Sequence, residues 1–476
     1  MRRAKIVCTL GPASHDLATI RALAQAGMDV ARLNFSHGDH AFHATLIGRI
    51  RQVARELGRP IAILQDLSGP KIRTGVLTGH LPVKLEPGAP LTLLAGSGDG
   101  TAQRVFTTLD LSGEVRVGEA ILLDDGLLEL CVDHITGREI HCRVVAGGAL
   151  NEKKGINLPG SRLSIPAVTD KDVADLHFGL EQEVDYVALS FVRSEHDVQV
   201  LRERIRHWAQ RHDGQGLDTP LIAKLEKPQA IDRLEEILNF SDGVMVARGD
   251  LGVELPPEKV PAIQKRIIRS ARAHRVPVIT ATQMLESMTE HPRPTRAEAS
   301  DVANAILDGS DAVMLSAETA SGKYPVEAVR MMARIIQEAE AIEPPRMVHR
   351  SDQDMGIPEA IAESVARTAV DLHLNAIAVY TKGGSTARLV SSYRPPCPIY
   401  ALAPNPRTRT RLALYWGVVP ITSPEIVSTD EMLGKAERQL LELKLVETGH
   451  TVAIVAGSPF GVPGRTNLMK ILRVGE

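Results

Sequence analysis

The fold is decided by the stretch LIAKLEKPQAIDRLEEILNFSDGVMVARGD at residues 221–250. Its two ends, 221–227 and 243–250, are short apolar runs, and the segment between them is long enough for a helix. Continuous runs of Val, Ile, Leu and Ala are typical of strands that are buried on both faces of a parallel sheet. Further runs of this kind occur at residues 5–10, 30–36, 61–67, 186–192, 277–284 and 312–319.

Segments of helical length follow these runs, with apolar residues three and four positions apart, as at 197–209 and 259–274. Eight strand–helix units are the number that closes a (β/α)8 TIM barrel. We therefore predict an α/β protein built on such a barrel. An open doubly wound sheet fits the same alternation and is the alternative.

Polar residues end nearly every apolar run. Barrel enzymes build their sites from the C-terminal ends of their strands, so these side chains are expected to converge on one mouth. They are Arg32 and Asn34, Asp66, Lys224 and Glu226, Arg248 and Asp250, Thr282, and Ser316 and Glu318.

The chain is long enough for three domains. We expect the barrel in residues 1–69 and 166–342. Residues 70–165 alternate short apolar runs with turn signals, which predicts a small β domain inserted as a lid over the mouth. Residues 343–476 follow a charged, proline-containing stretch and alternate strand and helix patterns, which predicts a C-terminal α/β domain.

The composition argues against two classes of partner. A net charge of −3 and an aromatic content of 3% give no basis for binding nucleic acid or a membrane. No stretch approaches the roughly 20 apolar residues of a membrane span. The four cysteines, Cys8, Cys131, Cys142 and Cys397, are far apart, which favours the reducing cytoplasm.

The chemistry is indicated most directly by Lys224, Glu226 and Asp250. Alternation along a strand places Lys224 and Glu226 on one face, with Asp250 expected at the end of the next strand. Two carboxylates suit Mg²⁺ or Mn²⁺, and a nearby ammonium can stabilise a phosphoryl group or an enolate. A buried ion pair would account for the same three residues.

Other local patterns carry less information. The glycine-bracketed turn at 249–252 would suit a phosphate or carboxylate but is also an ordinary strand–helix turn. Arg32 and Arg73 have guanidinium groups that match phosphate oxygens. Residues 295–298, TRAE, have the form of a helix capping box. Common phosphate loops, dinucleotide fingerprints and protein-kinase signatures are absent from the sequence.

Along essentially its whole length the chain resembles the pyruvate kinase family. The matching segments include KIVCTLGPAS, ARLNFSHG, DLSGPKIRTG, LDDGLLEL, IAKLEKPQAI, DGVMVARGDLGVELP, ITATQMLESM, PRPTRAEASDVANAILDGSDAVMLSAETASGKYP and TKGGSTARLVSSYRP. The resemblance implies transfer of a phosphoryl group from phosphoenolpyruvate to ADP, giving pyruvate and ATP. It also implies the barrel, the β lid and the C-terminal domain, and a homotetramer.

The resemblance also implies roles for individual residues. The divalent ion would be held by Glu226 and Asp250. Phosphoenolpyruvate would contact Arg32, Lys224, Gly249, Asp250 and Thr282. The catalytic residues would be Lys224, Arg73 and Thr282, the last of these protonating the enolate through water. The nucleotide side would comprise Asn34, Phe35, Ser36, His37, Arg73 and Lys171.

One departure from the family concerns K⁺. Many members read DTKGPEIR where this chain reads DLSGPKIR at residues 66–73, so Lys71 replaces a glutamate. We expect its ammonium to supply the charge that K⁺ otherwise provides, as in the branch of the family with this lysine. The K⁺ ligand positions are nevertheless matched by Asn34, Ser36, Asp66 and Leu67.

The C-terminal domain is expected to bind an effector. A phosphate nest at a strand-to-helix junction would be formed by Thr381, Lys382, Gly383, Gly384, Ser385 and Thr386. Family members bind a sugar phosphate or a nucleotide at the matching place. The loop from Gly457 to Arg465 would close over such a ligand.

Two rival functions remain at this point. A metal-dependent lyase or aldolase acting on pyruvate or oxaloacetate enolates could use the same barrel carboxylates. The β lid and Arg73 favour a kinase, because a lyase has no nucleotide to cover. A non-catalytic sensor of sugar phosphates is disfavoured by the joint presence of Lys224, Glu226, Asp250 and Thr282.

Overall fold

The structure is a computed structural model that describes all 476 residues except 1, 160–163, 343–354, 427 and 459–464. Its centre is a closed barrel of parallel strands in the order β1-β16-β15-β14-β13-β12-β3-β2. This confirms the predicted barrel over the open sheet. The barrel strands are β1 (Lys5–Leu10), β2 (Val30–Asn34), β3 (Ala62–Asp66), β12 (Tyr186–Leu189), β13 (Leu221–Leu225), β14 (Gly243–Ala247), β15 (Val278–Ala281) and β16 (Ala312–Leu315).

The barrel strands are mostly apolar because both of their faces are covered. Side chains such as Val7, Leu64 and Met245 fill the barrel interior, and alternate residues such as Ile6 and Val244 pack against the helices outside. Two residues of the C-terminal domain, Ala413 and Leu414, belong to the interior cluster and close the barrel floor. The closed floor leaves the opposite end as the mouth.

The outer helices begin where the sequence supplies caps. Asp16, Asp39 and Thr169 accept backbone hydrogen bonds at three N-termini, and Thr295 and Glu298 form the predicted capping box. The principal outer helices are α1 (Leu17–Ala26), α2 (His40–Glu56), α3 (Asp170–Glu181), α4 (Glu195–Arg211), α6 (Leu234–Phe240), α8 (Val260–Ala273), α9 (Arg296–Asp308) and α11 (Pro325–Ile342). None of the described helices could cross a membrane.

All the predicted strands except 5–10 end earlier than expected, and two of them are followed at once by a short helix. The run 243–250 leaves the sheet after Ala247, the last residue paired with β15, and continues as the short helix α7 (Arg248–Glu254). The run 312–319 likewise ends at Leu315, and helix α10 (Ala317–Ala320) follows. The predicted glycine-bracketed turn at 249–252 is therefore the beginning of a helix, because no neighbouring strand extends far enough to pair with it.

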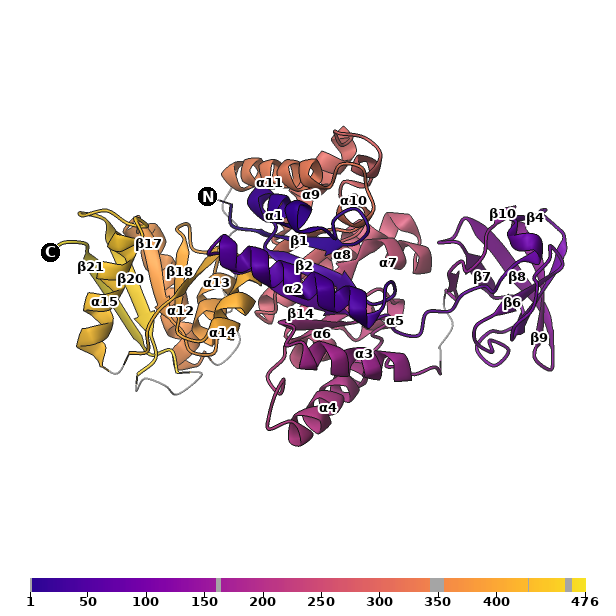
Figure 1. Cartoon of the computed structure of the whole chain (residues 1–476), viewed down its shortest axis with the longest axis horizontal. Coiled ribbons are helices and arrows are strands. Elements are labelled where there is room, and N and C mark those ends of the chain that lie inside the picture. The colour runs from indigo at the N-terminus through magenta and orange to yellow at the C-terminus, as the bar shows by residue number, and fades with distance from the viewer. Residues whose placement is uncertain (1, 160–163, 343–354, 427, 459–464) are drawn as a thin grey trace.

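The segment between β3 and α3 folds as β structure. A six-stranded sheet in the order β11-β7-β8-β9-β5-β6 lies beside the pair β10-β4 around its own apolar cluster. Figure 1 shows this unit standing apart at one end of the molecule. The strands are β4 (Val83–Leu85), β5 (Pro90–Ala95), β6 (Arg104–Thr107), β7 (Ala120–Leu123), β8 (Leu128–Thr136), β9 (Glu139–Ala146), β10 (Gly148–Leu150) and β11 (Ile156–Asn157).

The C-terminal α/β domain is built on a five-stranded sheet of order β19-β18-β17-β20-β21, in which only β21 is antiparallel. Apolar clusters cover both faces of this sheet. The elements are α12 (Ile357–Asp371), β17 (Ala376–Tyr380), α13 (Ser385–Ser392), β18 (Ile399–Ala403), α14 (Pro406–Arg411), β19 (Val418–Thr422), α15 (Thr429–Glu442), β20 (Thr451–Ala456) and β21 (Leu468–Arg473).

The C-terminal domain is attached to the N-terminal ends of the barrel strands. Lys5 donates to the carbonyl of Val418 at 2.7 Å, and the Tyr186 hydroxyl donates to the carbonyl of Arg411 at 2.6 Å. In Figure 1 this domain and the β unit accordingly lie at opposite ends of the barrel. The β unit therefore lies at the end of the barrel away from this floor.

A buried ion pair lies in the junction between the barrel and the C-terminal domain. Arg394 is 2.8 Å from Asp311, and the two side chains are 2% and 9% exposed. The Arg394 guanidinium also donates to the carbonyl of Gly309 at 2.9 Å and stacks over Trp416. Burial lowers the pKa of Arg394 to about 10, so the guanidinium remains charged near neutral pH.

We predict that Arg394→Ala lowers the free energy of unfolding by about 3–5 kcal/mol, because Asp311 would stay buried without its cation. Urea denaturation measures this change. The control is Arg367→Ala, which removes an arginine that is 73% exposed and paired with Asp371 on the same helix. The control should change stability by about 0.5 kcal/mol or less. Equal effects of the two variants would contradict the prediction.

Candidate active site

The mouth of the barrel is organised around the carboxylate of Asp66, at the end of β3. Arg32, from β2, donates its Nε–H to Asp66 Oδ2 at 2.7 Å, and its Nη2 lies 2.6 Å from the same oxygen. Lys224, from β13, places its ammonium 3.5 Å from the other carboxylate oxygen. The same ammonium donates to the Ser190 hydroxyl at 2.6 Å, and that hydroxyl donates to the carbonyl of Leu67 at 2.8 Å.

These charges are held in a dry environment. The side chains of Asp66, Lys224 and Arg32 are only 1%, 11% and 10% exposed. Burial alone would raise the pKa of Asp66, but the Lys224 and Arg32 cations hold this pKa below its usual value. Burial would likewise lower the pKa of Lys224, yet the Asp66 and Glu226 carboxylates raise it. Lys224 is therefore positively charged at neutral pH.

Glu226 follows β13, and its carboxylate faces the same cluster. Its Oε1 accepts the backbone N–H of Phe191 at 2.5 Å, and its Oε2 is 3.4 Å from the Lys224 ammonium. Burial raises the pKa of Glu226, and the negative charge of Asp250 raises it further although Lys224 opposes both effects. The two acids thus carry more negative charge than the nearby lysine compensates.

This excess negative charge fits a divalent cation. An ion near Glu226 and Asp250 would allow both carboxylates to stay ionised. Asp250 is exposed in the first turn of α7 and is therefore open to a ligand. No group of three or more His, Cys, Asp or Glu side chains suited to a metal is present among the described residues. A Mg²⁺ or Mn²⁺ ion here would take its other ligands from substrate and water.

Thr282 joins the end of β15 to the start of α7. Its backbone has a φ of +68°, which is unusual for a β-branched residue and marks a strained conformation. Its hydroxyl accepts the backbone N–H of Gly249 at 2.7 Å and donates to the carbonyl of Ala281 at 2.6 Å. Arg248 fixes the same turn by donating to the Thr282 carbonyl at 2.8 Å and to Asp301 at 2.7 Å.

The predicted nucleotide-side residues lie in the loop after β2, but their side chains differ in position. The amide oxygen of Asn34 accepts the Ser36 backbone N–H at 3.1 Å. The ring of Phe35 is buried and stacks on His43 with centroids 4.0 Å apart, so this ring is part of the barrel core. His37 lies near Arg73, Lys71 and Arg32. Burial lowers the pKa of His37, and the positive charges of these three residues lower it further.

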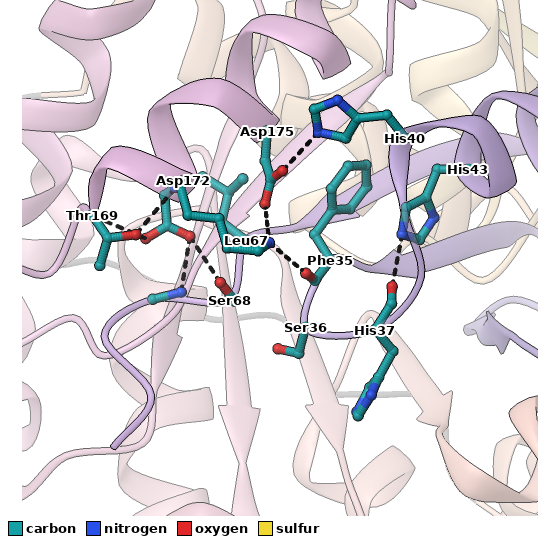
Figure 2. Close-up of polar contacts among 12 residues, drawn as sticks. Phe35, Ser36, His37, His40, His43, Leu67, Ser68, Thr169, Asp172 and Asp175 are labelled. Carbon is teal, nitrogen blue, oxygen red and sulfur yellow. Dashed lines mark hydrogen bonds and ion pairs between the residues drawn. The ribbon is translucent and has the colours of Figure 1, made fainter. Parts of the chain in front are cut away.

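Helix α3 fastens this loop to the segment after β3. Lys171 donates to the carbonyl of Phe35 at 2.8 Å and to Asp175 at 2.5 Å. Figure 2 shows the Asp172 carboxylate between Thr169 and Ser68, and the Asp175 carboxylate beside His40. The sequence analysis missed Asp172 and Asp175, although the Thr169–Asp172 capping box could have indicated the first.

Lys71 and Arg73 lie at the entrance to the β unit and are not in direct contact with Lys224. Arg73 directs Nη1 to the carbonyl of Lys153 at 3.1 Å. The Lys71 side chain is exposed. Partial desolvation and the positive charge of Arg73 lower the pKa of Lys71, whereas the negative charge of Asp250 raises it. With His37, these residues form a basic rim beside the Asp66 cluster.

The predicted effector residues form the junction of β17 and α13. The Thr381 hydroxyl accepts the N–H of Gly384 at 2.9 Å, and Gly384 has a φ of +90° that favours glycine. The hydroxyls of Thr386 and Thr466 are 2.9 Å apart. Lys382 is more than half exposed and 3.7 Å from Glu425. The predicted closing loop from Gly457 to Arg465 lies largely outside the described residues, which omit 459–464.

Comparisons with known proteins agree on one family. The model of the pyruvate kinase barrel domain matches residues 1–329, and that of the pyruvate kinase alpha/beta domain matches residues 359–472. Proteins named pyruvate kinase from Staphylococcus saprophyticus and Bacillus licheniformis are 46% and 47% identical, over 100% of this chain and 81% of each relative. A crystal structure of a pyruvate kinase from Cryptosporidium parvum has a TM-score of 0.92 and 37% identity, covering 99% of this chain and 96% of that one.

We predict that Asp66→Asn lowers the free energy of unfolding by about 3–5 kcal/mol, because Arg32 and Lys224 would stay buried without their shared anion. A urea denaturation series measures the loss. Asp218→Asn is the matched control, since Asp218 also contacts two arginines, Arg407 and Arg411, but is 70% exposed. The control should cost less than about 1 kcal/mol. An Asp66→Asn variant as stable as the control would contradict this account of the cluster.

Proposed function

The chain belongs to the pyruvate kinase family, and we propose that the Asp66 cluster at the barrel mouth is where it transfers the phosphoryl group of phosphoenolpyruvate to ADP. The observation that carries this assignment is the buried pair of cations, Arg32 and Lys224, which share Asp66 at the C-terminal ends of the barrel strands, with Glu226 beside Lys224. Their charge is already fixed before substrate arrives, so little reorganisation is needed as negative charge moves during the transfer.

The family uses a divalent metal, and we assign its site in this chain to Glu226 and Asp250. The uncompensated charge of these two carboxylates supports the assignment. When bound, Mg²⁺ or Mn²⁺ offsets negative charge on the phosphoryl oxygens and on the substrate. The phosphoenolpyruvate carboxylate would lie against Gly249 and Asp250, near Thr282.

The remaining roles follow from charge and position. Lys224 holds the phosphoryl group and the enolate oxygen, and Arg32 and Arg73 bind phosphate oxygens in planar, bidentate fashion. Thr282 relays a proton to the enolate carbon through water. Its hydroxyl already takes part in two short hydrogen bonds, which fix its orientation.

On the nucleotide side we assign Asn34, Ser36, His37, Lys171 and Phe35. Phe35 would contribute its backbone, because its ring is buried in the core. The β unit, with Arg73 at its base, would close over the nucleotide and exclude water from the reaction.

We predict that Lys224→Met lowers kcat at least about a hundredfold, because it removes a fixed positive charge from the transferring group. Pyruvate formation from phosphoenolpyruvate, measured with and without ADP, gives the rate. Lys265→Met, at a half-exposed lysine paired with Asp308 on the barrel surface, is the control and should keep the wild-type rate. A folded Lys224→Met enzyme with wild-type turnover would refute the assignment, and ADP-independent pyruvate release would favour the lyase alternative.

We further propose that the enzyme works without K⁺, as in the branch with lysine at this position. Of the matched K⁺ positions, Asn34, Ser36, Asp66 and Leu67, the Asp66 carboxylate is already neutralised by Arg32 and Lys224. Lys71 adds a further positive charge at the basic rim. A monovalent cation would therefore enter an already positive environment.

The expected result is that replacing Na⁺ by K⁺ at constant ionic strength leaves the initial rate of the wild-type enzyme nearly unchanged. Lys71→Glu restores the glutamate of other family members and should create a K⁺ requirement. Lys71→Gln removes the positive charge without adding a carboxylate. It therefore separates the effect of losing the ammonium from the effect of gaining a carboxylate. Strong K⁺ stimulation of the wild type would overturn the proposal.

We also propose that the junction at Thr381, Lys382, Gly383, Gly384, Ser385 and Thr386 binds a phosphorylated effector, a sugar phosphate or a nucleotide, and that the enzyme is a cytoplasmic homotetramer. Exposed Lys382 and the backbone at the start of α13 support the first assignment. The free cysteines are consistent with a reducing compartment. Light scattering tests the tetramer.

For the effector, we predict that a hexose phosphate or a nucleoside monophosphate raises the Tm of the wild type and that Lys382→Ala abolishes the rise. Lys435→Ala, which removes a partly exposed lysine paired with Glu431 on α15, is the control and should retain it. A thermal shift that survives in Lys382→Ala would move the effector away from this junction.

A further inference from the structure

A cavity of about 680 Å³ lies at the junction of the barrel floor and the C-terminal domain, far from the mouth. Its walls come from the C-terminal end of α2, the loop before β12, and α14 with the residue preceding it. Figure 1 shows the end of α2 reaching toward the C-terminal domain near α14. The volume is that of a pocket for a small metabolite.

The cavity is strongly basic. Five arginines line it, Arg51, Arg55, Arg59, Arg407 and Arg409, whereas only two lining residues are acidic, Glu183 and Asp185. The Asp185 carboxylate is buried and accepts the backbone N–H of Ile63 at 2.8 Å. The lining residues therefore give an excess of three positive charges around one open cavity.

Most of these arginines form no ion pair with a described residue. Arg51, Arg59 and Arg409 donate only to main-chain carbonyls, such as those of Gln182 and Gly58, within the described part of the chain. The side chain of Arg55 has no hydrogen bond or ion pair to any described residue. Only Arg407 contacts a carboxylate, Asp218, at 3.4 Å.

Two arginine nitrogens in this cavity are both buried and unpaired. The Nε atoms of Arg407 and Arg409 are shielded from solvent and lack a hydrogen-bond partner among the described residues. Burial lowers the pKa of each side chain, and for Arg407 the charge of Arg411 lowers it further although Asp218 opposes this. An anion in the cavity would offset the charge of these partly buried guanidinium groups.

We propose that this cavity binds a small polyanion carrying two or more phosphate groups. Guanidinium groups match phosphate oxygens in planar pairs, and several arginines around one cavity can bind more than one phosphate. The site is distinct from the barrel mouth and from the junction at 381–386. It does not depend on the assignment of the catalytic residues.

Occupation of the cavity would act on α14, which is held on both sides. The Tyr186 hydroxyl donates to the Arg411 carbonyl, and the Thr408 hydroxyl donates to the carbonyl of Lys382 at 2.9 Å. An anion that also binds Arg409 would tie α14 to α2. The cavity therefore lies where a ligand would fix the C-terminal domain against the barrel floor.

The test uses inorganic pyrophosphate as the probe and the full chain as the protein. Isothermal titration calorimetry should detect binding that weakens about tenfold in Arg55→Ala, the loss expected for one charge-assisted hydrogen bond. Arg55→Ala should leave the fold intact, because its side chain has no partner among the described residues. Arg367→Ala removes one exposed arginine elsewhere and should bind pyrophosphate like the wild type.

Variants at the other anion sites identify where pyrophosphate binds. Binding at the cavity should persist in Lys382→Ala and in Lys224→Met, and hydrogen exchange should show pyrophosphate protecting amides near residues 51–61 and 405–410. The double variant Arg51→Ala/Arg409→Ala should lose that protection. The proposal is overturned if pyrophosphate does not bind, if Arg55→Ala binds like Arg367→Ala, or if binding disappears only in Lys382→Ala or Lys224→Met.

Discussion

The ion cluster of Asp66 with Arg32 and Lys224 is the constraint on which the rest of the mouth depends. Two cations at a phosphate site repel each other and are costly to bury, so they require a shared anion that is itself buried. Asp66 meets this need because β2, β3, β12 and β13 are successive neighbours in the closed barrel. The substrate then meets positive charge that is already oriented.

The two ends of the barrel have different surroundings for a physical reason. The floor is closed by Leu414 and Ala413 and held by the Arg394–Asp311 pair, and buried side chains fill the interior, so water and substrate meet the barrel at its mouth. At the mouth, chain segments leave the sheet early, as at Ala247 and Leu315, and expose backbone groups. The strained Thr282 persists there because Arg248 and Gly249 hold it from two directions.

The sequence predicted what depends on short-range periodicity. Apolar runs gave the barrel, and alternation placed Lys224 and Glu226 together on one face. It could not predict that Lys224 lies near Asp66, because 158 positions (224 − 66), including the whole β unit, separate them along the chain. Nor could the sequence show that the Phe35 ring turns into the core, since that orientation depends on stacking against His43 in α2. Asp172 and Asp175 contact residues from loops and helices outside α3, such as Ser68 and His40, and local sequence patterns do not reveal these contacts.

Strand β12 runs between the arginine-lined cavity at the barrel floor and the Asp66 cluster at the mouth. Asp185, in the wall of the arginine-lined cavity, precedes the strand, and Ser190, which accepts from Lys224, follows it. A strand of four residues that pairs with β3 on one side and β13 on the other keeps its length, so a displacement of its start relative to α14 would be accompanied by a movement of its end. Because Ser190 also donates to Leu67, such a movement would alter the position of the Lys224 ammonium relative to Asp66. The arginine-lined cavity at the floor and the Lys224 cluster at the mouth thus lie at the two ends of one short strand.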